Sequence, residues 1–98
     1  MENVNFKPLD PLLHSELRLS IMSILMMFEK SDFQYIKEQT GATSGNISVQ
    51  LDKLSEAGYI EVNKLFKGKR PCTECTITEK GRKAFNDYVE ALKSYLPK

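Results

Sequence analysis

Short polar side chains gather in residues 43–60, which read TSGNISVQLDKLSEAGYI. Within this stretch Ile47, Leu51 and Leu54 recur at helical spacing and predict a helix with one narrow apolar face. The other faces carry hydrogen-bonding side chains, on Ser44, Asn46, Ser48, Gln50 and Lys53. Such groups can read base edges in the major groove of DNA, and small residues at a helix start let a phosphate backbone approach closely. The pattern favours hydrogen bonding to a nucleic acid, with an ordinary solvated helix face as the alternative.

Cys72 and Cys75 are the second group that suggests chemistry, because their C-x-x-C spacing occurs in zinc and redox sites. A structural zinc needs four ligands, and His14 supplies the one other soft ligand in the chain. On a regular strand, residues three apart point to opposite faces, so the two sulfurs would not converge. We therefore expect ordinary strand residues and no metal, cofactor or enzymatic activity. A thiol or metal switch at these cysteines is kept as an alternative.

A helix-turn-helix is predicted over residues 31–58. Ser31 and Gln34 fit a capping box at the start of the first helix, which is expected to end at Gly41. The hydroxyl of Thr43 is expected to cap the second helix by accepting a backbone N–H of its first turn. Two short helices joined by a tight turn that contains glycine are typical of this motif.

Residues 10–30 predict a first helical segment, since Asp10-Pro11 is a typical helix start, and a break is expected near His14-Ser15. The expected core face comprises Leu13, Leu17, Ile21, Ile24, Leu25 and Phe28. A second apolar face comprises Leu19, Met22 and Met26. A helix that is apolar on two sides is either central to the core or covered by a partner chain.

Residues 59–77 predict a β-hairpin, with strands over 59–66 and 72–77 and a turn over 67–71. The tip is basic and carries no acid; its cations are Lys64, Lys67, Lys69 and Arg70. Lysines often protect a sheet edge from pairing with other chains, but this cluster would also suit DNA phosphates or a minor groove. Thr78 is expected to cap a last helix that ends near Leu96.

The composition bounds the remaining possibilities. The chain has 98 residues, a net charge of +1, 41% hydrophobic and 28% charged residues, which fit one soluble globular domain without a global basic field. Its longest apolar stretch, residues 21–28, is too short to cross a membrane, and its first ten residues do not resemble a secretory signal. Two cysteines without an export signal favour a reducing cytoplasm.

The order of these elements resembles the winged-helix DNA-binding domains of bacterial transcriptional regulators, in particular the MarR-like group and its short single-domain relatives. Three segments carry the resemblance: LDPLLHSELRLSIMSIL, NISVQLDKLSEAGYI and FKGKRPCTECTITEKGRKAF. They resemble the opening helix, the recognition helix, and the wing with the start of the C-terminal helix. The resemblance implies one domain over residues 1–98, mainly α with a small β-hairpin (α+β). Its expected parts are an irregular 1–9, the segments 10–30, 31–58 and 59–77, and a dimerisation helix over 78–96.

The resemblance also assigns roles to residues. The expected DNA-facing positions on the recognition helix are Thr43, Ser44, Gly45, Asn46, Ser48, Val49, Gln50 and, for phosphate, Lys53. The wing would contribute Lys67, Lys69 and Arg70. The dimer interface would comprise Leu12, Leu19, Met22, Met26, Phe85, Tyr88, Val89, Leu92, Tyr95 and Leu96. With only one cation on the recognition helix, Asn46 and Gln50 would suit adenine edges rather than guanine.

We therefore expect a homodimeric repressor that binds double-stranded DNA at a pseudo-palindromic operator. A small-molecule effector is left open. The near-neutral net charge and the cation-poor recognition helix favour one other class, a winged helix that binds a protein partner.

Overall fold

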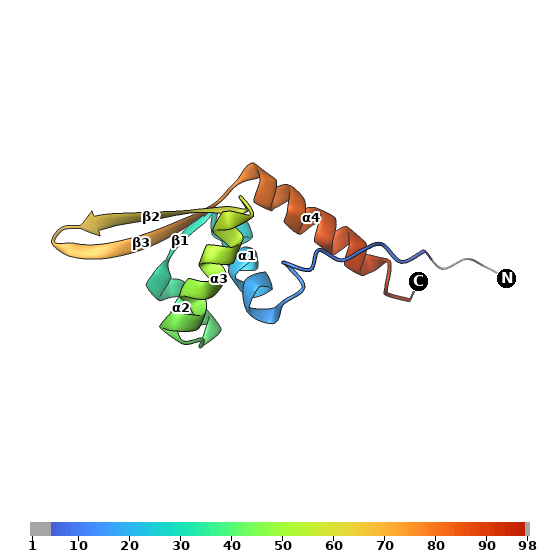
Figure 1. Ribbon diagram of the computed structural model, residues 1–98, viewed down its shortest axis with the longest axis horizontal. Coiled ribbons are helices and arrows are strands. Elements are labelled where there is room, and N and C mark those ends of the chain that lie inside the picture. Colours follow the sequence, from blue (N-terminus) through green and yellow to red (C-terminus); the bar gives the residue numbers. More distant parts are fainter. Residues whose placement is uncertain (1–4, 98) are drawn as a thin grey trace.

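The computed structural model describes residues 5–97. Its elements are α1 (Glu16–Phe28), β1 (Lys30–Asp32), α2 (Phe33–Thr40), α3 (Ser44–Glu56), β2 (Ile60–Lys67), β3 (Arg70–Ile77) and α4 (Glu79–Lys93) (Figure 1). Helices α1 to α3 gather at the centre, the β2–β3 hairpin projects from one end, and α4 leaves from the other. The result is an elongated molecule of 65 × 25 × 21 Å. The predicted fold class, an α+β winged helix-turn-helix, is confirmed.

One apolar core joins the central helices to the base of the sheet. Its buried side chains are Leu13, Ile21, Met22, Ile24, Leu25, Ile36, Ile47, Leu51, Leu54, Ile60, Cys75, Ile77 and Tyr88. Burying one such aliphatic side chain contributes roughly 1.5–3 kcal/mol, so this cluster supplies the main driving force for folding. Within residues 5–97, no polar or charged side chain is buried in it.

The first helical segment breaks where the sequence indicated. A carboxylate oxygen of Asp10 accepts the backbone N–H of Leu12 at 2.9 Å and closes a single turn. Helix α1 then begins after Ser15, whose hydroxyl accepts the N–H of Arg18. The expectation that Phe28 lies in the core is wrong: its side chain is 55% exposed and meets Tyr35 edge to face. The chain turns away at Glu29, where φ is 67°, and enters β1.

Strand β1 was not predicted, and it displaces the predicted capping box. Asp32, not Ser31, caps α2 and accepts the N–H of Tyr35 at 2.8 Å. Ser31 lies within β1, opposite Cys75 in β3. A strand of three residues is too short to show alternation, and its partner lies far along the chain. The sheet is therefore three-stranded and antiparallel, in the order β1-β3-β2.

Helix α3 begins and ends through local signals. The Thr43 hydroxyl accepts the N–H of Asn46 at 3.2 Å, as predicted. At the other end Gly58 has a φ of 80°, and the N–H of Tyr59 donates to the carbonyl of Leu54 at 3.0 Å. This left-handed cap satisfies carbonyls of the last turn. The chain then enters β2.

The hairpin turn is tighter than predicted. Lys67 pairs with Arg70, so only Gly68 and Lys69 form the loop, and Gly68 takes a φ of 65°. In the register of the hairpin, Val62 lies opposite Cys75. The strands therefore run further toward the tip than residues 59–66 and 72–77, because a two-residue loop with a positive-φ glycine suits their twist.

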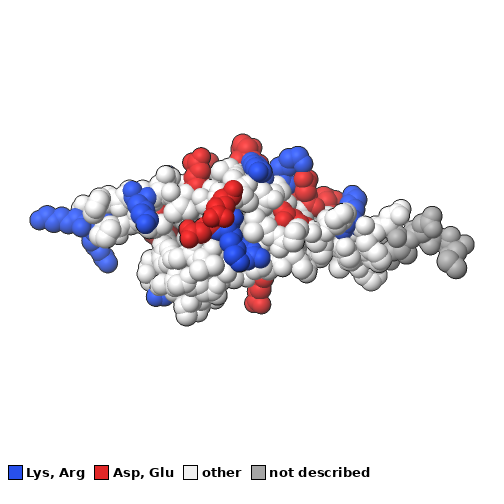
Figure 2. Space-filling view, viewed as in Figure 1, with Lys and Arg blue, Asp and Glu red and all other residues white. Residues whose placement is uncertain are grey.

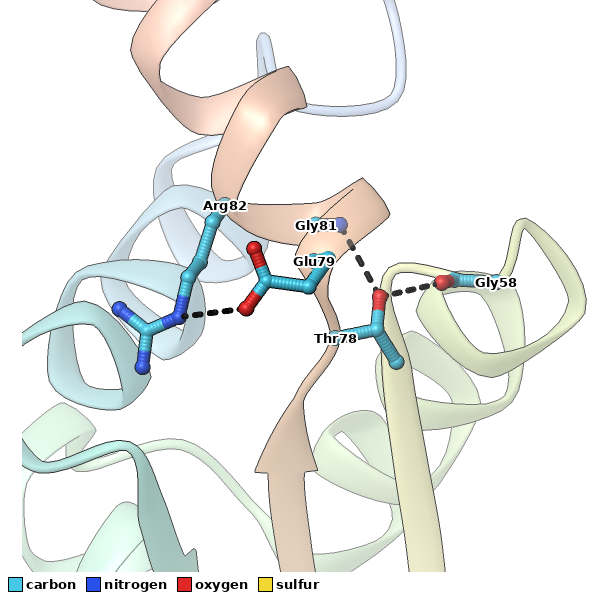
Figure 3. A network of polar contacts seen from close by, with 5 residues as sticks. All are labelled: Gly58, Thr78, Glu79, Gly81 and Arg82. Carbon is cyan, nitrogen blue, oxygen red and sulfur yellow. Dashed lines mark hydrogen bonds and ion pairs between the residues drawn. The ribbon is translucent and has the colours of Figure 1, made fainter.

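Helix α4 is locked to the end of α3 by one hydroxyl. Figure 3 shows Thr78 Oγ1 accepting the N–H of Gly81 at 3.0 Å and donating to the carbonyl of Gly58 at 2.6 Å. On the first turn of α4, Arg82 Nε lies 4.0 Å from Glu79 Oε1. The predicted Thr78 cap is thus confirmed, and the helix ends at Lys93, before Leu96.

Candidate nucleic-acid interface

Helix α3 packs against the core on one face and presents polar side chains to solvent on the other. Ile47, Leu51 and Leu54 are buried in the core. The predicted DNA-facing residues that are exposed are Thr43, Ser44, Gly45, Asn46, Ser48, Val49 and Lys53. The structure thus presents nearly all of the predicted set on one element. It does so with one cation on α3, Lys53.

Gln50 is the exception, because it is half-buried and held by a neighbour. Arg18 on α1 donates from Nη1 to Gln50 Oε1 at 2.5 Å. Gln50 Nε2 in turn donates to Asn46 Oδ1 at 2.9 Å. Sequence reasoning missed Arg18. The signal was present, since Arg18 is the one cation in a helix that is otherwise rich in aliphatic residues.

The wing carries the predicted basic side chains. Lys64, Lys67, Lys69 and Arg70 are exposed, and Figure 2 shows basic side chains gathered at the projecting end of the hairpin. The ion pairs formed by the described residues all lie within α4, so none of them neutralises the wing. The wing is therefore a local positive patch on a protein of near-zero net charge.

The predicted dimer residues divide into three groups by exposure. Leu92, Tyr95 and Leu96 are exposed, whereas Leu12, Leu19, Met26, Phe85 and Val89 are half-buried. Met22 is 0% exposed and Tyr88 is 4% exposed, so both pack inside this chain and neither presents surface to a partner. The Tyr88 hydroxyl oxygen instead lies 2.9 Å from His14 Nδ1, within hydrogen-bonding distance. The resemblance implies an interface on the terminal helices, and helical periodicity alone does not tell which apolar residues of those helices face inward.

Residues 5–9 have no regular secondary structure, as expected, but Phe6 and Lys7 contact this surface. The ring of Phe6 stacks on Tyr95 with 4.9 Å between centroids. The N–H of Lys7 donates to the Ser94 hydroxyl at 3.1 Å, and the Tyr95 hydroxyl donates to the Lys7 carbonyl at 2.9 Å. These contacts form a projecting arm of residues 5–9 and 92–96. Residues 1–4 of the expected irregular segment lie outside the described residues.

The cysteines are free thiols in unlike surroundings. Cys72 is half-buried, and Cys75 is buried in the core. Burial, helped by the charges of Glu74 and Asp32, raises the pKa of the Cys75 thiol to about 11. Across residues 5–97 no cluster of three or more His, Cys, Asp or Glu side chains is suited to a metal ion. In the same range, none of the helices has the length and apolar character of a membrane span.

Comparison with known proteins agrees with this geometry. The sequence matches the winged helix DNA-binding domain family over residues 17–96. An uncharacterized protein of Methanocaldococcus jannaschii is 38% identical over 76 residues, or 78% of this chain and 83% of that protein. A transcriptional regulator homologue protein from Pyrococcus horikoshii OT3 superposes with a TM-score of 0.80 at 27% identity, over 86% of this chain and 83% of that one.

A structure of overoxidized AbfR bound to DNA superposes with a TM-score of 0.74 at 19% identity, over 85% of this chain and 60% of that chain. At this identity the likeness concerns the fold. The family match covers the central helices, the wing and α4, which are the elements built above from their caps and core. The chain therefore belongs to the winged helix DNA-binding domain family and has the MarR-like fold of DNA-binding transcriptional regulators.

Proposed function

We propose that this protein is a sequence-specific DNA-binding regulator that acts as a homodimeric repressor on a pseudo-palindromic operator. The observation that carries the proposal is the two-sided character of α3. Three buried aliphatic residues fix its position, while its exposed first turns present hydroxyl and amide groups. A helix with these properties can lie in the major groove and read base edges.

The wing would supply the contacts that do not depend on sequence. Lys67, Lys69 and Arg70 are exposed at the tip of a two-residue turn, free of acidic neighbours within residues 62–73. Their charges would neutralise phosphates beside the groove that α3 enters, or reach into the minor groove. A regulator of net charge +1 needs such a local patch, because its overall field attracts DNA weakly.

The projecting arm would form the dimer contact. Phe6, Tyr95 and Leu96 keep much of their apolar surface exposed at the end of the molecule opposite the wing. Grouped apolar surface of this kind is typical of an interface between chains. Two α3 helices related by a two-fold axis would read half-sites about 10 base pairs apart, or a multiple of that spacing.

A second function, binding a protein partner through α3 or the wing, is favoured by the cation-poor α3.

The test that separates the two functions is a titration of the purified protein against duplex DNA from its own upstream region at two salt concentrations, with light scattering for mass. A dimer that protects a site and weakens steeply as salt rises supports the regulator. A folded protein without affinity for any duplex at low salt supports the protein-binding function instead.

The repressor assignment needs a separate measurement. Transcription from the protected upstream region is compared with and without the protein, using the same template with the protected site scrambled as the control. Lower transcription that depends on the site supports repression. Higher transcription from the intact site would contradict it.

A further inference from the structure

Among the hydrogen bonds formed by residues 5–97, the bond from Arg18 is the one that joins α1 to the polar face of α3. Its Nη1 donates to Gln50 Oε1 at 2.5 Å, and its Nε donates to the Leu12 carbonyl at 2.5 Å. The guanidinium is thus held on two sides, by the turn before α1 and by α3. Because the planar group presents its donors in a fixed fork, two such bonds define its orientation.

The hydrogen bond from Arg18 also determines how the Asn46 side-chain amide is oriented, through Gln50. A guanidinium has only donors, so it selects the oxygen of the Gln50 amide and turns the nitrogen away. That nitrogen is a donor, and it selects the oxygen of Asn46, at 2.9 Å. Asn46 is exposed, and this bond turns its oxygen toward Gln50 and its amide nitrogen, which is also a donor, away from Gln50.

We infer that Arg18 sets the base preference of α3 by holding Asn46 as a hydrogen-bond donor. In the major groove, guanine O6 and thymine O4 are acceptors, whereas adenine N6 and cytosine N4 are donors. Asn46 held in this way would prefer the keto bases, guanine and thymine, to the amino bases. This inference rests on the proposed DNA-binding function and deepens it, because it assigns a chemical class of base to one position of the site.

The inference changes the expectation drawn from the sequence. Paired contacts to adenine need both the oxygen and the nitrogen of the Asn46 amide. Here the bond from Gln50 takes one lone pair of that oxygen and holds the oxygen toward Gln50, which Arg18 holds in turn, so the amide cannot turn freely to face one adenine with both groups. Gln50 therefore acts as a positioning residue, and Asn46 is the residue that meets the base.

The test is selection of binding sites from random duplexes, with four proteins compared at equal salt. The wild type is expected to favour keto over amino bases at one position by about fivefold or more, as one good base contact allows. Arg18→Met keeps a long apolar stem and removes the donors, so this ratio should fall to within about twofold. The three hydrogen-bonded residues Arg18, Gln50 and Asn46 form the relay. Arg82→Met removes the same charge at the start of α4, outside the relay, and should leave the ratio of keto to amino bases unchanged.

Gln50→Glu gives the sharpest outcome. The carboxylate still accepts from Arg18 but cannot donate, so Asn46 would turn its nitrogen toward residue 50 and its oxygen outward. The preference at that position should then reverse toward adenine and cytosine. The added negative charge weakens binding to all sequences, so the ratio of bases within each selection is compared rather than affinity.

A measurement without DNA separates failure of the relay from failure of DNA binding. In nitrogen-15 spectra of the free protein, Arg18→Met should shift the side-chain amide signals of both Gln50 and Asn46, and Arg82→Met should shift neither. Unmoved Asn46 signals, or an unchanged base ratio in both relay variants, would overturn the inference. Shifted signals in a protein that binds no duplex would remove the base preference together with the proposed function.

Discussion

Gly81 and Gly45 stand in helices under opposite steric demands. A Cβ at Gly81 would overlap the backbone oxygen of Tyr59 and press on Ile77, whereas a Cβ at Gly45 would meet nothing within 4 Å. Gly81→Ala should therefore lower the free energy of unfolding by about 1–3 kcal/mol, because backbone must shift to admit the methyl group. Gly45→Ala, the matched control, should raise it by up to about 1 kcal/mol through helix propensity.

Urea unfolding of the two alanine variants measures both effects. Equal stabilities would show that the close approach of α4 to Tyr59 is not a constraint on the native fold.

Tyr59 couples stability to alkaline pH. Its hydroxyl donates to Asp10 at 2.6 Å. Burial, the hydrogen bond and the charge of Asp10 raise the pKa of Tyr59 from 10.0 to about 12. A raised pKa in the folded state stabilises the protein fully below pH 10, and this contribution is lost as the pH rises from about 10 to about 12.

The variant Tyr59→Phe isolates this contribution. It should be less stable than the wild type at pH 7, and the difference between the two proteins should shrink as the pH rises above 10. Denaturant unfolding across that range measures it. A stability difference that stays constant with pH would contradict the assigned role of the Tyr59–Asp10 contact.

The two thiols should react at very different rates. Cys75 is buried and its raised pKa keeps it protonated near neutral pH, so an alkylating reagent should leave it unmodified in the folded protein. Cys72 is half-buried and should react first. Mass spectrometry of peptides after labelling, with and without denaturant, distinguishes the two sites. Rapid labelling of Cys75 in the native protein would instead favour a thiol switch at this pair.

At the scale of elements, the wing and α3 should contribute separable kinds of binding. Changing Lys69 and Arg70 together to Ala should weaken binding to all duplexes alike and reduce the salt slope by about one unit for each phosphate that the wing no longer neutralises. The matched control is Lys80→Ala with Lys83→Ala, which removes the same charge from exposed positions of α4 outside the arm. Affinities at several salt concentrations test this. A weakening confined to one preferred sequence would place the wing in base recognition instead.

The sequence correctly predicted the elements whose boundaries depend on residues close together in the chain. Thr43 and Thr78 cap α3 and α4 as expected, because an N-cap depends on residues a few positions apart. Strand β1 depends on its pairing with β3, and nothing within Lys30–Asp32 indicates a strand. Its formation moved the helix cap from Ser31 to Asp32.

At the scale of the whole molecule, the arm should determine the oligomeric state. Leu92→Lys with Leu96→Lys places two charges on its exposed apolar surface and should convert a dimer into a folded monomer. The control, Met27→Lys with Phe66→Lys, adds the same charge at exposed apolar residues outside the arm and should leave the mass unchanged. Light scattering and far-ultraviolet circular dichroism report mass and folding together. A dimer that survives the arm substitutions would move the interface elsewhere.

The sequence by itself determined the order of the four helices and the hairpin, the buried face of α3, and the residue types at the polar helix and the basic wing. Periodicity, caps and turns are encoded within short windows, so they can be read without knowing what packs against them. Only the tertiary structure decided that Met22 and Tyr88 face inward, that Phe6 stacks on Tyr95, and that Arg18 engages Gln50. Each of these contacts joins segments far apart in the chain, and the free energy of such a contact depends on which surfaces folding brings together.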